Sequence, residues 1–324
     1  MKIRKISVSL FFICLLMVSM LCSNLHITAL ASGHVKEDVL NYWAPQVYQD
    51  LRQDKVLWHQ YYPAGDMITN INYDGDWDAG NNWDNVPRNG DYSMMKAYAY
   101  GIYVETETHY FLKYCFYHAM DDAFFSADRH ENDVEDVCLA IRKGQQNNGY
   151  GTFEVMETTV HSSKGEYTID DVVFETTNGC HPKVFISSNG DVLNDQLDIY
   201  AKGHAIFAFD PDYHTKDKVI GDDAIIYNVG DIAQAPTNID GEFTSSYYYK
   251  ILSIDEIWNR RYEIGDYNTF ESYGTLNGRD QAVGGCFGWD TQSLKDPATY
   301  YNDKYNLLQN GAVSSNYLYN PYIN

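Results

Sequence analysis

Basic residues are scarce in this sequence. Lys and Arg together number 23 against 45 Asp and Glu, which gives a formal net charge of −22. Proteins that bind nucleic acids use basic patches that displace counterions from the phosphates, so nucleic acid is not an expected partner. The same balance weakens any simple electrostatic attraction to anionic lipids. It agrees with a protein that collects cations, although an acidic composition also serves solubility alone.

Several common catalytic motifs are missing as well. The sequence contains no Gly-x-Ser-x-Gly elbow, no His-Glu-x-x-His pair, no P-loop and no dinucleotide-binding glycine pattern. A serine or cysteine hydrolase therefore has no positive support, and whether the protein is an enzyme is left open. Cys-x-x-Cys spacing is absent too, which argues against a thiolate zinc site.

Long apolar runs are confined to the N-terminus. Residues 6–22 are mostly apolar and follow three basic residues among the first five. We predict that residues 1–31 are a signal peptide, cleaved after the small residue Ala31, and that the mature protein is secreted to the extracellular space. Loss of the three basic residues changes the net charge to 20 − 45 = −25. No later stretch approaches the roughly 18 consecutive apolar residues of a membrane span, so none is expected.

The remaining residues, 32–324, are predicted to form one domain rich in strands. The sequence contains 29 Tyr and 14 Phe, and its short apolar runs alternate with Gly, Asn and Asp, a pattern typical of sheets. Strands are expected at 95–104, 108–117, 134–141, 151–160, 166–175, 183–187 and 247–252. A helical pattern begins at residue 34 and is interrupted by Pro45. Ser253 and Glu256 have the spacing of a capping box that opens a short helix.

Four cysteines remain outside the predicted leader, namely Cys115, Cys138, Cys180 and Cys286. Four cysteines in an exported protein permit three pairings. Cys115 and Cys138 lie on consecutive expected strands and could face each other, but free buried thiols fit a large core equally well. The pairing therefore stays open.

The chain is organised around residues 109–142, where an acidic segment leads into an apolar strand. Successive side chains of a strand point to opposite faces. One face of this strand is apolar after two acids and consists of Asp133, Glu135, Val137, Leu139 and Ile141. The other face is more polar, could meet solvent, and consists of Val134, Asp136, Cys138, Ala140 and Arg142.

If the apolar face is buried, Asp133 and Glu135 are drawn inside together, where uncompensated anions are costly. A shared proton, a Lys or Arg from elsewhere, or a bound divalent cation would neutralise them. Just upstream, His130 adds an imidazole, and Asp121 and Asp122 add one or two carboxylates. This mostly oxygen ligand set suits Ca²⁺ or Mg²⁺ better than Zn²⁺ or Mn²⁺. The plain alternative is a strand end whose acids face water.

Two other polar features have simpler interpretations. Asp74, Asp76 and Asp78 repeat as in a calcium loop, but the bidentate Glu that such a loop requires is absent. A polar loop is therefore the first interpretation and a secondary cation site the second. His204 begins an apolar run, where a lone His is typically a hydrogen-bonded structural residue.

The order of strand, Asp-bearing loop, His-x-x-Asp-x-Glu and strand resembles the necrosis-inducing protein superfamily and the related vacuolar-protein-sorting 62-like proteins. In that superfamily, a motif of the type Gly-His-Arg-His-Asp-Trp-Glu or His-Glu-Gly-Asp-Trp-Glu supplies metal ligands. The resemblance implies that His130, Asp133 and Glu135 are ligands. Asp121 fits the family's aromatic-then-Asp segment, which supplies a fourth ligand, and Asp122 fits the distance to His130.

Two shorter segments are similar to the sorting-protein branch. Residues 40–48 resemble its opening Ala-Pro segment. The element at 203–205 resembles its later Gly-x-His-Ala element, which adds His204 to the candidate metal ligands. Val134 replaces the family's usual Trp and Asn132 replaces a second His or a Gly, which argues against membrane damage of the plant-toxin type. The resemblance implies an all-β fold, a β-sandwich with short peripheral helices, and a cation site at one rim.

Three functions are compatible with these residues. In the first, a rim cation binds a cell-surface glycan or a lipid headgroup, with cytolytic activity as an extension. Trp77 and Trp83 would then contact sugar rings, unless they are core residues. In the second, a metal-dependent hydrolase activates water, with Glu131, Asp136 or a nearby His as general base. In the third, the cation is purely structural and the protein is a scaffold. The resemblance favours the first.

Overall fold

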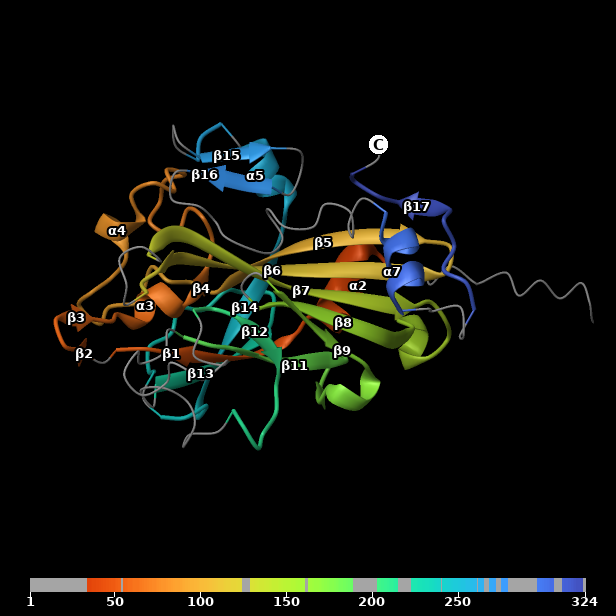
Figure 1. Cartoon of the computed structure of the whole chain (residues 1–324), viewed down its shortest axis with the longest axis horizontal. Helices are drawn as coiled ribbons and strands as arrows, with labels where there is room; N and C mark the ends of the chain where they lie inside the picture. Colours follow the sequence, from red (N-terminus) through yellow and green to blue (C-terminus); the bar gives the residue numbers. More distant parts are fainter. Residues whose placement is uncertain are drawn as a thin grey trace, which may run out of the picture.

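The computed structural model describes most of the chain from residue 34 onward. The described ranges are 34–53, 55–123, 129–160, 163–188, 203–214, 223–239, 241–260, 262–264, 268–271, 275–278, 296–305 and 311–322. The predicted signal peptide and Cys286 lie outside these ranges. Strands dominate and the helices are short, which confirms the all-β prediction (Figure 1).

A sheet of thirteen strands organises the fold. Its main path has the order β10-β11-β1-β13-β14-β5-β6-β7-β8-β9, and β12, β17 and β4 pair with β11, β5 and β6. The longest strands, β6 (His109–Asp121) and β7 (His130–Arg142), form an antiparallel pair over nearly their whole lengths. The others are β1 (Gln46–Leu51), β4 (Ile68–Thr69), β5 (Tyr98–Thr106), β8 (Thr152–Val160), β9 (Ser163–Tyr167), β10 (Phe174–Glu175), β11 (His181–Ile186), β12 (Ile206–Ala208), β13 (Asp223–Val229), β14 (Ser245–Ser253) and β17 (Tyr317–Tyr319). Two separate ladders join β2 (Lys55–Val56) to β3 (His59–Gln60) and β15 (Asn268–Glu271) to β16 (Thr275–Gly278).

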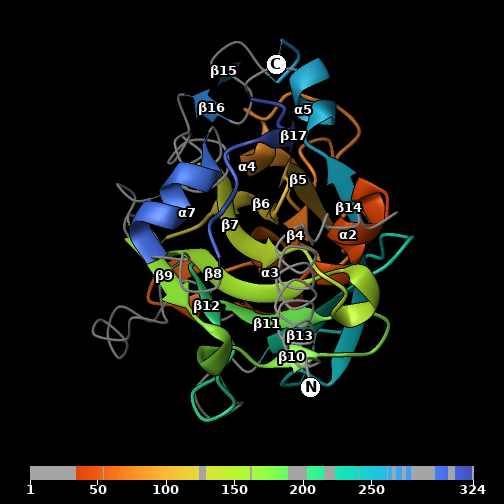
Figure 2. The ribbon, with the colours of Figure 1, turned by 90° about the vertical axis from the view of Figure 1, so that its right-hand side faces the viewer.

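The sheet curves until its two ends meet. β12 pairs with β11 near one end of the strand order. The hydroxyl of Thr158 on β8, near the other end, donates to the carbonyl of Ile206 on β12 at 2.6 Å. The two halves face each other across one apolar core, which includes Leu139, Val184 and Tyr227 (Figure 2). This arrangement is the β-sandwich that the sequence resemblance implied.

The helices lie at the periphery of the sandwich. They are α2 (Lys36–Trp43), α3 (Pro63–Asp66), α4 (Asn82–Asn85), α5 (Asp255–Asn259), α7 (Pro297–Tyr305) and the 3-10 turns η1 (Asn147–Gly149) and η2 (Ile169–Asp171). Helix α2 lies within the helical pattern that the sequence predicted and buries Val39, Leu40 and Trp43. It ends before Pro45 because proline disfavours helical geometry in the residue ahead of it. Among the described residues, no helix is both long and apolar enough to cross a membrane.

The helix predicted after Ser253 exists as α5, but the predicted capping box is wrong. The N-cap position is Ile254, which makes no side-chain capping hydrogen bond. The Ser253 hydroxyl instead donates to the Asp255 carboxylate at 2.9 Å. The Ser-x-x-Glu spacing is therefore present without the reciprocal bonds that define the motif.

Both faces of β7 are covered. Val137, Leu139 and Ile141 pack into the main core, as the alternation predicted. Cys138 and Ala140 point to the opposite face, where they form a smaller core with Tyr301 of α7. The suggestion that this second face meets solvent is therefore wrong, since the C-terminal part of the chain covers it (Figure 2).

The cysteines differ in their packing and in their bonding. Cys115 on β6 belongs to the main core and is disulfide-bonded. Cys138 lies in the smaller core, and both Cys138 and Cys180 are free thiols. The considered pairing of Cys115 with Cys138 is therefore wrong, because Cys138 is a free thiol, although the register places both residues on the same face of the β6–β7 hairpin.

Candidate functional site

The predicted site lies where β6 ends and β7 begins. Asp121, the last residue of β6, is directly opposite His130, the first residue of β7. Asp133 pairs with His118, and Glu135 with Phe116. Because Asp133 and Glu135 share the parity of the core residues that follow them, both are drawn inside, and they are only 2% and 1% exposed. The same end of the sandwich carries α3, α4 and the β2–β3 hairpin (Figure 1).

His204 connects two carboxylates at the centre of this site. Its Nδ1 lies 2.6 Å from Oδ2 of Asp133, and its Nε2 lies 3.1 Å from Oδ1 of Asp66. Burial alone would lower the pKa of His204, but the bonds to Asp133 and Asp66 outweigh burial and raise that pKa to about 10. His204 is therefore an imidazolium at neutral pH and donates from both nitrogens.

His118 supports His204 from one side. The two rings are stacked with their centroids 3.8 Å apart and an angle of 3° between their planes. The Nδ1 of His118 lies 2.9 Å from the backbone carbonyl of Asp66, to which it donates. Burial, and then the charge of His204, lowers the pKa of His118 well below its usual value. A neutral ring therefore stacks on a charged one, and the pair holds its orientation without charge repulsion.

The sequence named both Asp121 and Asp122, and the structure separates them. Asp121 Oδ2 lies 3.8 Å from Nε2 of His130, on the side of the predicted ligands. Asp122 instead lies 2.5 Å from Arg129 and 3.1 Å from His59. Gly203 permits the close approach to Asp121, because a Cβ at that position would lie 2.7 Å from Asp121 Oδ2.

Glu135 is the least compensated acid of the group. Its Oε2 atom is buried and has no hydrogen-bond partner in the structure. Burial, followed by the nearby charges of Asp133 and Asp136, raises the pKa of Glu135 well above its usual value. Asp133 behaves differently: burial opposes its ionisation, but His204 and the neighbouring histidines lower its pKa. The protein has therefore supplied a counter-charge to Asp133 and none to the adjacent Glu135.

We call the group formed by Asp66, His118, Asp121, His130, Asp133, Glu135 and His204 the inner cluster. Its four carboxylates exceed its single imidazolium, His204. Arg52 adds a cation at the edge, since its backbone NH donates to Asp66 at 2.8 Å and its guanidinium lies over the Tyr61 ring. Asp50 adds another buried acid beside it, with a pKa raised by burial. The inner cluster thus combines hard oxygen donors, one further imidazole in His130, and an excess of negative charge, which are the properties of a divalent cation site.

The side chains of the inner cluster are not arranged around a common metal position. Among the described residues, no group of three or more His, Cys, Asp or Glu side chains is arranged to hold a metal ion. The assignment of Asp121, Asp122, His130, Asp133, Glu135 and His204 as metal ligands therefore stays a prediction. The structure adds Asp66 and His118, which the sequence reasoning missed; Asp66 lies 138 positions from His204 in the chain, and no local motif marks it.

The two acids considered as general bases are engaged elsewhere. Glu131 accepts a hydrogen bond from the backbone NH of Trp83 at 2.7 Å. Asp136 points to the opposite face of β7, where it lies 3.1 Å from Lys113. Asp136 therefore faces away from the inner cluster.

The acidic loop near residue 76 closes on itself. Asp74, Asp76 and Asp78 each accept a hydrogen bond from the backbone NH two residues onward, at 3.2, 2.8 and 3.0 Å. Trp77 and Trp83, named as partners for sugars or as core residues, are partly buried against the main core. The loop therefore has the internal hydrogen bonding of a polar loop.

Comparisons with known proteins give structural neighbours only. No family model matches the sequence, and no curated protein matches it. A protein described as a toxin fold for microbial attack and plant defense is 17% identical with a TM-score of 0.32, over 55% of this chain and 70% of the other. The non-toxic HaNLP3 protein is 12% identical with a TM-score of 0.32, over 69% of this chain and 74% of its own. Necrosis and Ethylene inducing Protein 2, from the causal agent of cocoa's witches' broom disease, is 14% identical with a TM-score of 0.30, over 56% and 70%. At these TM-scores the likeness carries no inference about activity.

Proposed function

We propose that the protein is a secreted divalent-cation-binding protein whose ion is held by the inner cluster. Asp121, Asp133 and Glu135 would supply the oxygen ligands and His130 a nitrogen ligand. The observation that carries this proposal is the buried, unpartnered Oε2 of Glu135 beside a second buried acid. Hard oxygen donors favour Ca²⁺ or Mg²⁺ over Zn²⁺. Secretion rests on the signal peptide predicted at residues 1–31.

The remaining predicted ligands have supporting roles in this proposal. Both nitrogens of His204 already contact carboxylates, so this residue positions Asp133 for the ion. Asp122 pairs with Arg129 and holds the segment that leads into His130. Such supporting contacts orient metal ligands and tune their basicity.

The ion would face its partner through His130, which is the most exposed of the proposed ligands, with 18% of its side chain accessible. We propose that the partner is a cell-surface glycan or a lipid headgroup. The neighbouring β2–β3 hairpin supports this choice, because its tip residues Leu57 and Trp58 are 58% and 74% exposed. His59 of the same hairpin lies 3.1 Å from Asp122 and ties the tip to the site. An exposed Trp beside a charged site suits a headgroup at a membrane surface, and cytolysis would be a later consequence of that attachment.

The test compares cation-dependent stabilisation in matched variants. A ligand at a hundredfold excess over its Kd stabilises a folded protein by about 2.7 kcal/mol, and a domain larger than 150 residues then melts roughly 5–10 °C higher. We expect Ca²⁺ or Mg²⁺ to raise the Tm of EDTA-treated protein, and Asp133→Ala and Glu135→Ala each to abolish that shift.

Asp136→Asn is the matched control, since Asp136 lies on the same strand but faces Lys113 on the other side. This variant should keep the cation-dependent shift. An unchanged shift in both Asp133→Ala and Glu135→Ala would reject the site. Once cation binding is established, two assays test the partner, namely leakage from liposomes and binding to a glycan array, each with and without EDTA. If the protein binds the cation but responds in neither assay, the ion is purely structural.

A further inference from the structure

A cavity lies at the opposite end of β1 from the inner cluster. It has a volume of about 510 Å³, within the range of small-molecule sites. Gln46, at the start of β1, lines the cavity, whereas Arg52, just past the end of β1, lies at the edge of the inner cluster. None of the lining residues belongs to the inner cluster, so the two sites are independent.

The wall of this cavity carries charge of one sign. Three carboxylates line it, from Asp38 of α2, Glu175 of β10 and Asp231 just after β13. Neither Lys nor Arg occurs among the described residues that line it. Burial lowers the pKa of His181, another lining residue, so that ring is neutral near pH 7. The cavity therefore repels anions and attracts cations.

Gln46 supplies a hydrogen-bond acceptor that the protein itself leaves unused. The side chain is 91% buried, being 9% exposed, and its Nε2 donates to Oδ1 of Asn228 at 2.7 Å. Its Oε1 has no hydrogen-bond partner in the structure. An unsatisfied buried acceptor is costly, and a donor brought by a ligand would relieve that cost.

Aromatic rings complete the wall. Tyr42 and Tyr150 are stacked with centroids 3.9 Å apart and planes 4° from parallel, and His34 stacks on Tyr150 at 3.8 Å. Tyr248 lines the same cavity and is 51% exposed. Tyr42 and His34 cover the two faces of Tyr150, so Tyr42 and Tyr248 are the rings whose negative faces can attract a cation and cover the alkyl part of an organic molecule.

We propose that this cavity binds a small organic molecule that carries a primary ammonium group. The three carboxylates select the positive charge, the tyrosines contact the carbon chain, and an ammonium N–H donates to Oε1 of Gln46. A quaternary ammonium has the same charge but no N–H, so it meets only part of these requirements.

The probe is 1,4-diaminobutane, titrated by calorimetry into the full-length mature protein at physiological salt, with its fully N-methylated counterpart as the matched ligand. We expect the diamine to bind at least tenfold more tightly than the methylated compound. A hydrogen bond to a charged group is worth about tenfold or more in affinity, so Gln46→Leu should weaken diamine binding by about that factor. Gln46→Glu should maintain or strengthen it, because it adds negative charge.

Because Gln46 is buried, its variants could fail to fold, so substitutions at exposed positions of the cavity provide a second test. Asp38→Asn and Asp231→Asn at the rim should each weaken binding by roughly two- to fivefold. Asp84→Asn, an equal charge change outside the cavity, should leave it unchanged and so excludes nonspecific attraction to an acidic protein. Absence of diamine binding to the wild type, equal binding of the methylated compound, weaker binding by Gln46→Glu, or preferential binding of uncharged glucose would each overturn the proposal.

Discussion

Strand β7 places buried acids on both of its faces, and the two faces neutralise them differently. On the outer face, covered by α7, Asp136 lies 3.1 Å from Lys113. Farther along the same face, Glu154 of β8 lies 2.6 Å from Arg142. On the inner face, Glu135 has a buried oxygen without a partner. The chain thus provides basic side chains on one face and leaves the other face with excess negative charge.

Glu157 shows how many partners surround a buried acid on the outer face. This buried residue of β8 contacts Lys304 at 2.7 Å and Lys164 at 3.4 Å, and the hydroxyl of Tyr300 donates to it at 2.9 Å. Burial would raise the pKa of Glu157, but these contacts lower it, whereas the pKa of Glu135 is raised. Carboxylates of similar burial therefore shift in opposite directions, and the number of nearby cations decides the sign.

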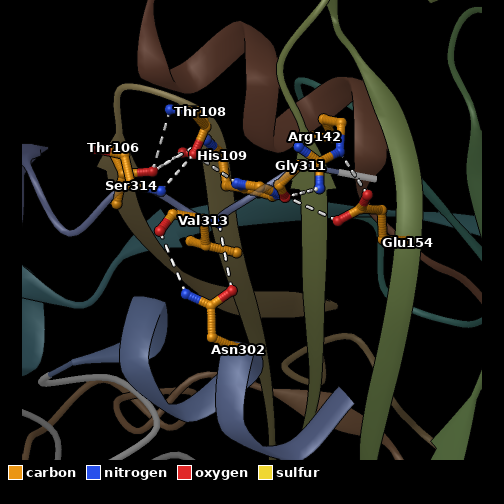
Figure 3. A network of polar contacts seen from close by, with 9 residues as sticks. All are labelled: Thr106, Thr108, His109, Arg142, Glu154, Asn302, Gly311, Val313 and Ser314. Carbon is orange, nitrogen blue, oxygen red and sulfur yellow. Dashed lines mark hydrogen bonds and ion pairs between the residues drawn. The ribbon is translucent and has the colours of Figure 1, made fainter. Parts of the chain in front are cut away.

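The C-terminal segment secures the outer face. Arg142 donates to the carbonyl of Gly311 at 2.9 Å, and the backbone NH of Ser314 donates to the Thr108 hydroxyl at 2.8 Å (Figure 3). His109 lies 3.0 Å from Glu154 in the same network. These bonds give the charged groups of the outer face partners within the protein itself, whereas Glu135 in the inner cluster keeps a buried oxygen without one.

The largest expected effect comes from removing the basic partner of a buried acid on the outer face, so that this acid is left uncompensated as Glu135 is on the inner face. Lys113→Met leaves Asp136 buried without its cation and should lower the free energy of unfolding by about 3–5 kcal/mol. The double variant Lys113→Met/Asp136→Leu should recover most of that loss. Urea denaturation measures both, and a single variant as stable as the wild type would show that the pair does not compensate Asp136.

The next effect is expected in acid. The pKa values of Glu154 and Glu157 are lowered in the folded state, so the folded protein binds these protons less readily than the unfolded chain. Their contribution is fully present above the ordinary glutamate pKa of about 4.3 and is lost as the pH falls through the lowered values. Below about pH 4.3, the unfolding free energy of Glu157→Gln should therefore fall less steeply with decreasing pH than that of the wild type. An equally steep decline in the variant would contradict the assignment.

A smaller loss is expected where the C-terminal segment meets α7. The Asn302 side chain exchanges two hydrogen bonds with the backbone of Val313, each 3.3 Å long (Figure 3). Asn302→Ala should lower the unfolding free energy by about 1 kcal/mol. Asn302→Asp, which keeps the acceptor but loses the donor, should cost less than the alanine variant if the bond from Val313 NH matters.

The smallest effect is expected at the inner face without metal. Glu135 is held with a raised pKa, so replacing it by the isosteric neutral Gln removes little folded-state charge. In EDTA, Glu135→Gln should therefore change the unfolding free energy by less than Asn302→Ala does. A loss comparable to that of Lys113→Met would mean that an ionised Glu135 is already compensated by the protein.

The alternation of side chains along β7 made part of the inner cluster predictable from the sequence. The other part depends on contacts between segments that are far apart in the chain. The spacing of Asp133 and Glu135 relative to Val137 predicted that the two acids share the apolar face, and the structure decides between burial and solvent by burying both. The contact of Asp66 with His204 was not predictable, because it joins the end of α3 to the segment before β12, and their meeting depends on the closure of the whole sheet.

The same distinction explains why two other predictions were wrong or incomplete. Residues 297–305 carried no motif, so nothing indicated that α7 would cover the outer face of β7 and turn Cys138 into a core residue. The choice between Asp121 and Asp122 likewise depended on where Arg129 and His59 lie, which spacing along the chain does not encode.

The central claim is that the inner face of β7 is completed by one divalent cation. Equilibrium dialysis against Mg²⁺ or Ca²⁺, followed by metal analysis of the protein, counts the bound ions directly. We predict one ion per chain for the wild type and for Asp136→Asn, and none for Glu135→Gln. No bound ion in the wild type, or the same one ion in Glu135→Gln, would contradict the account.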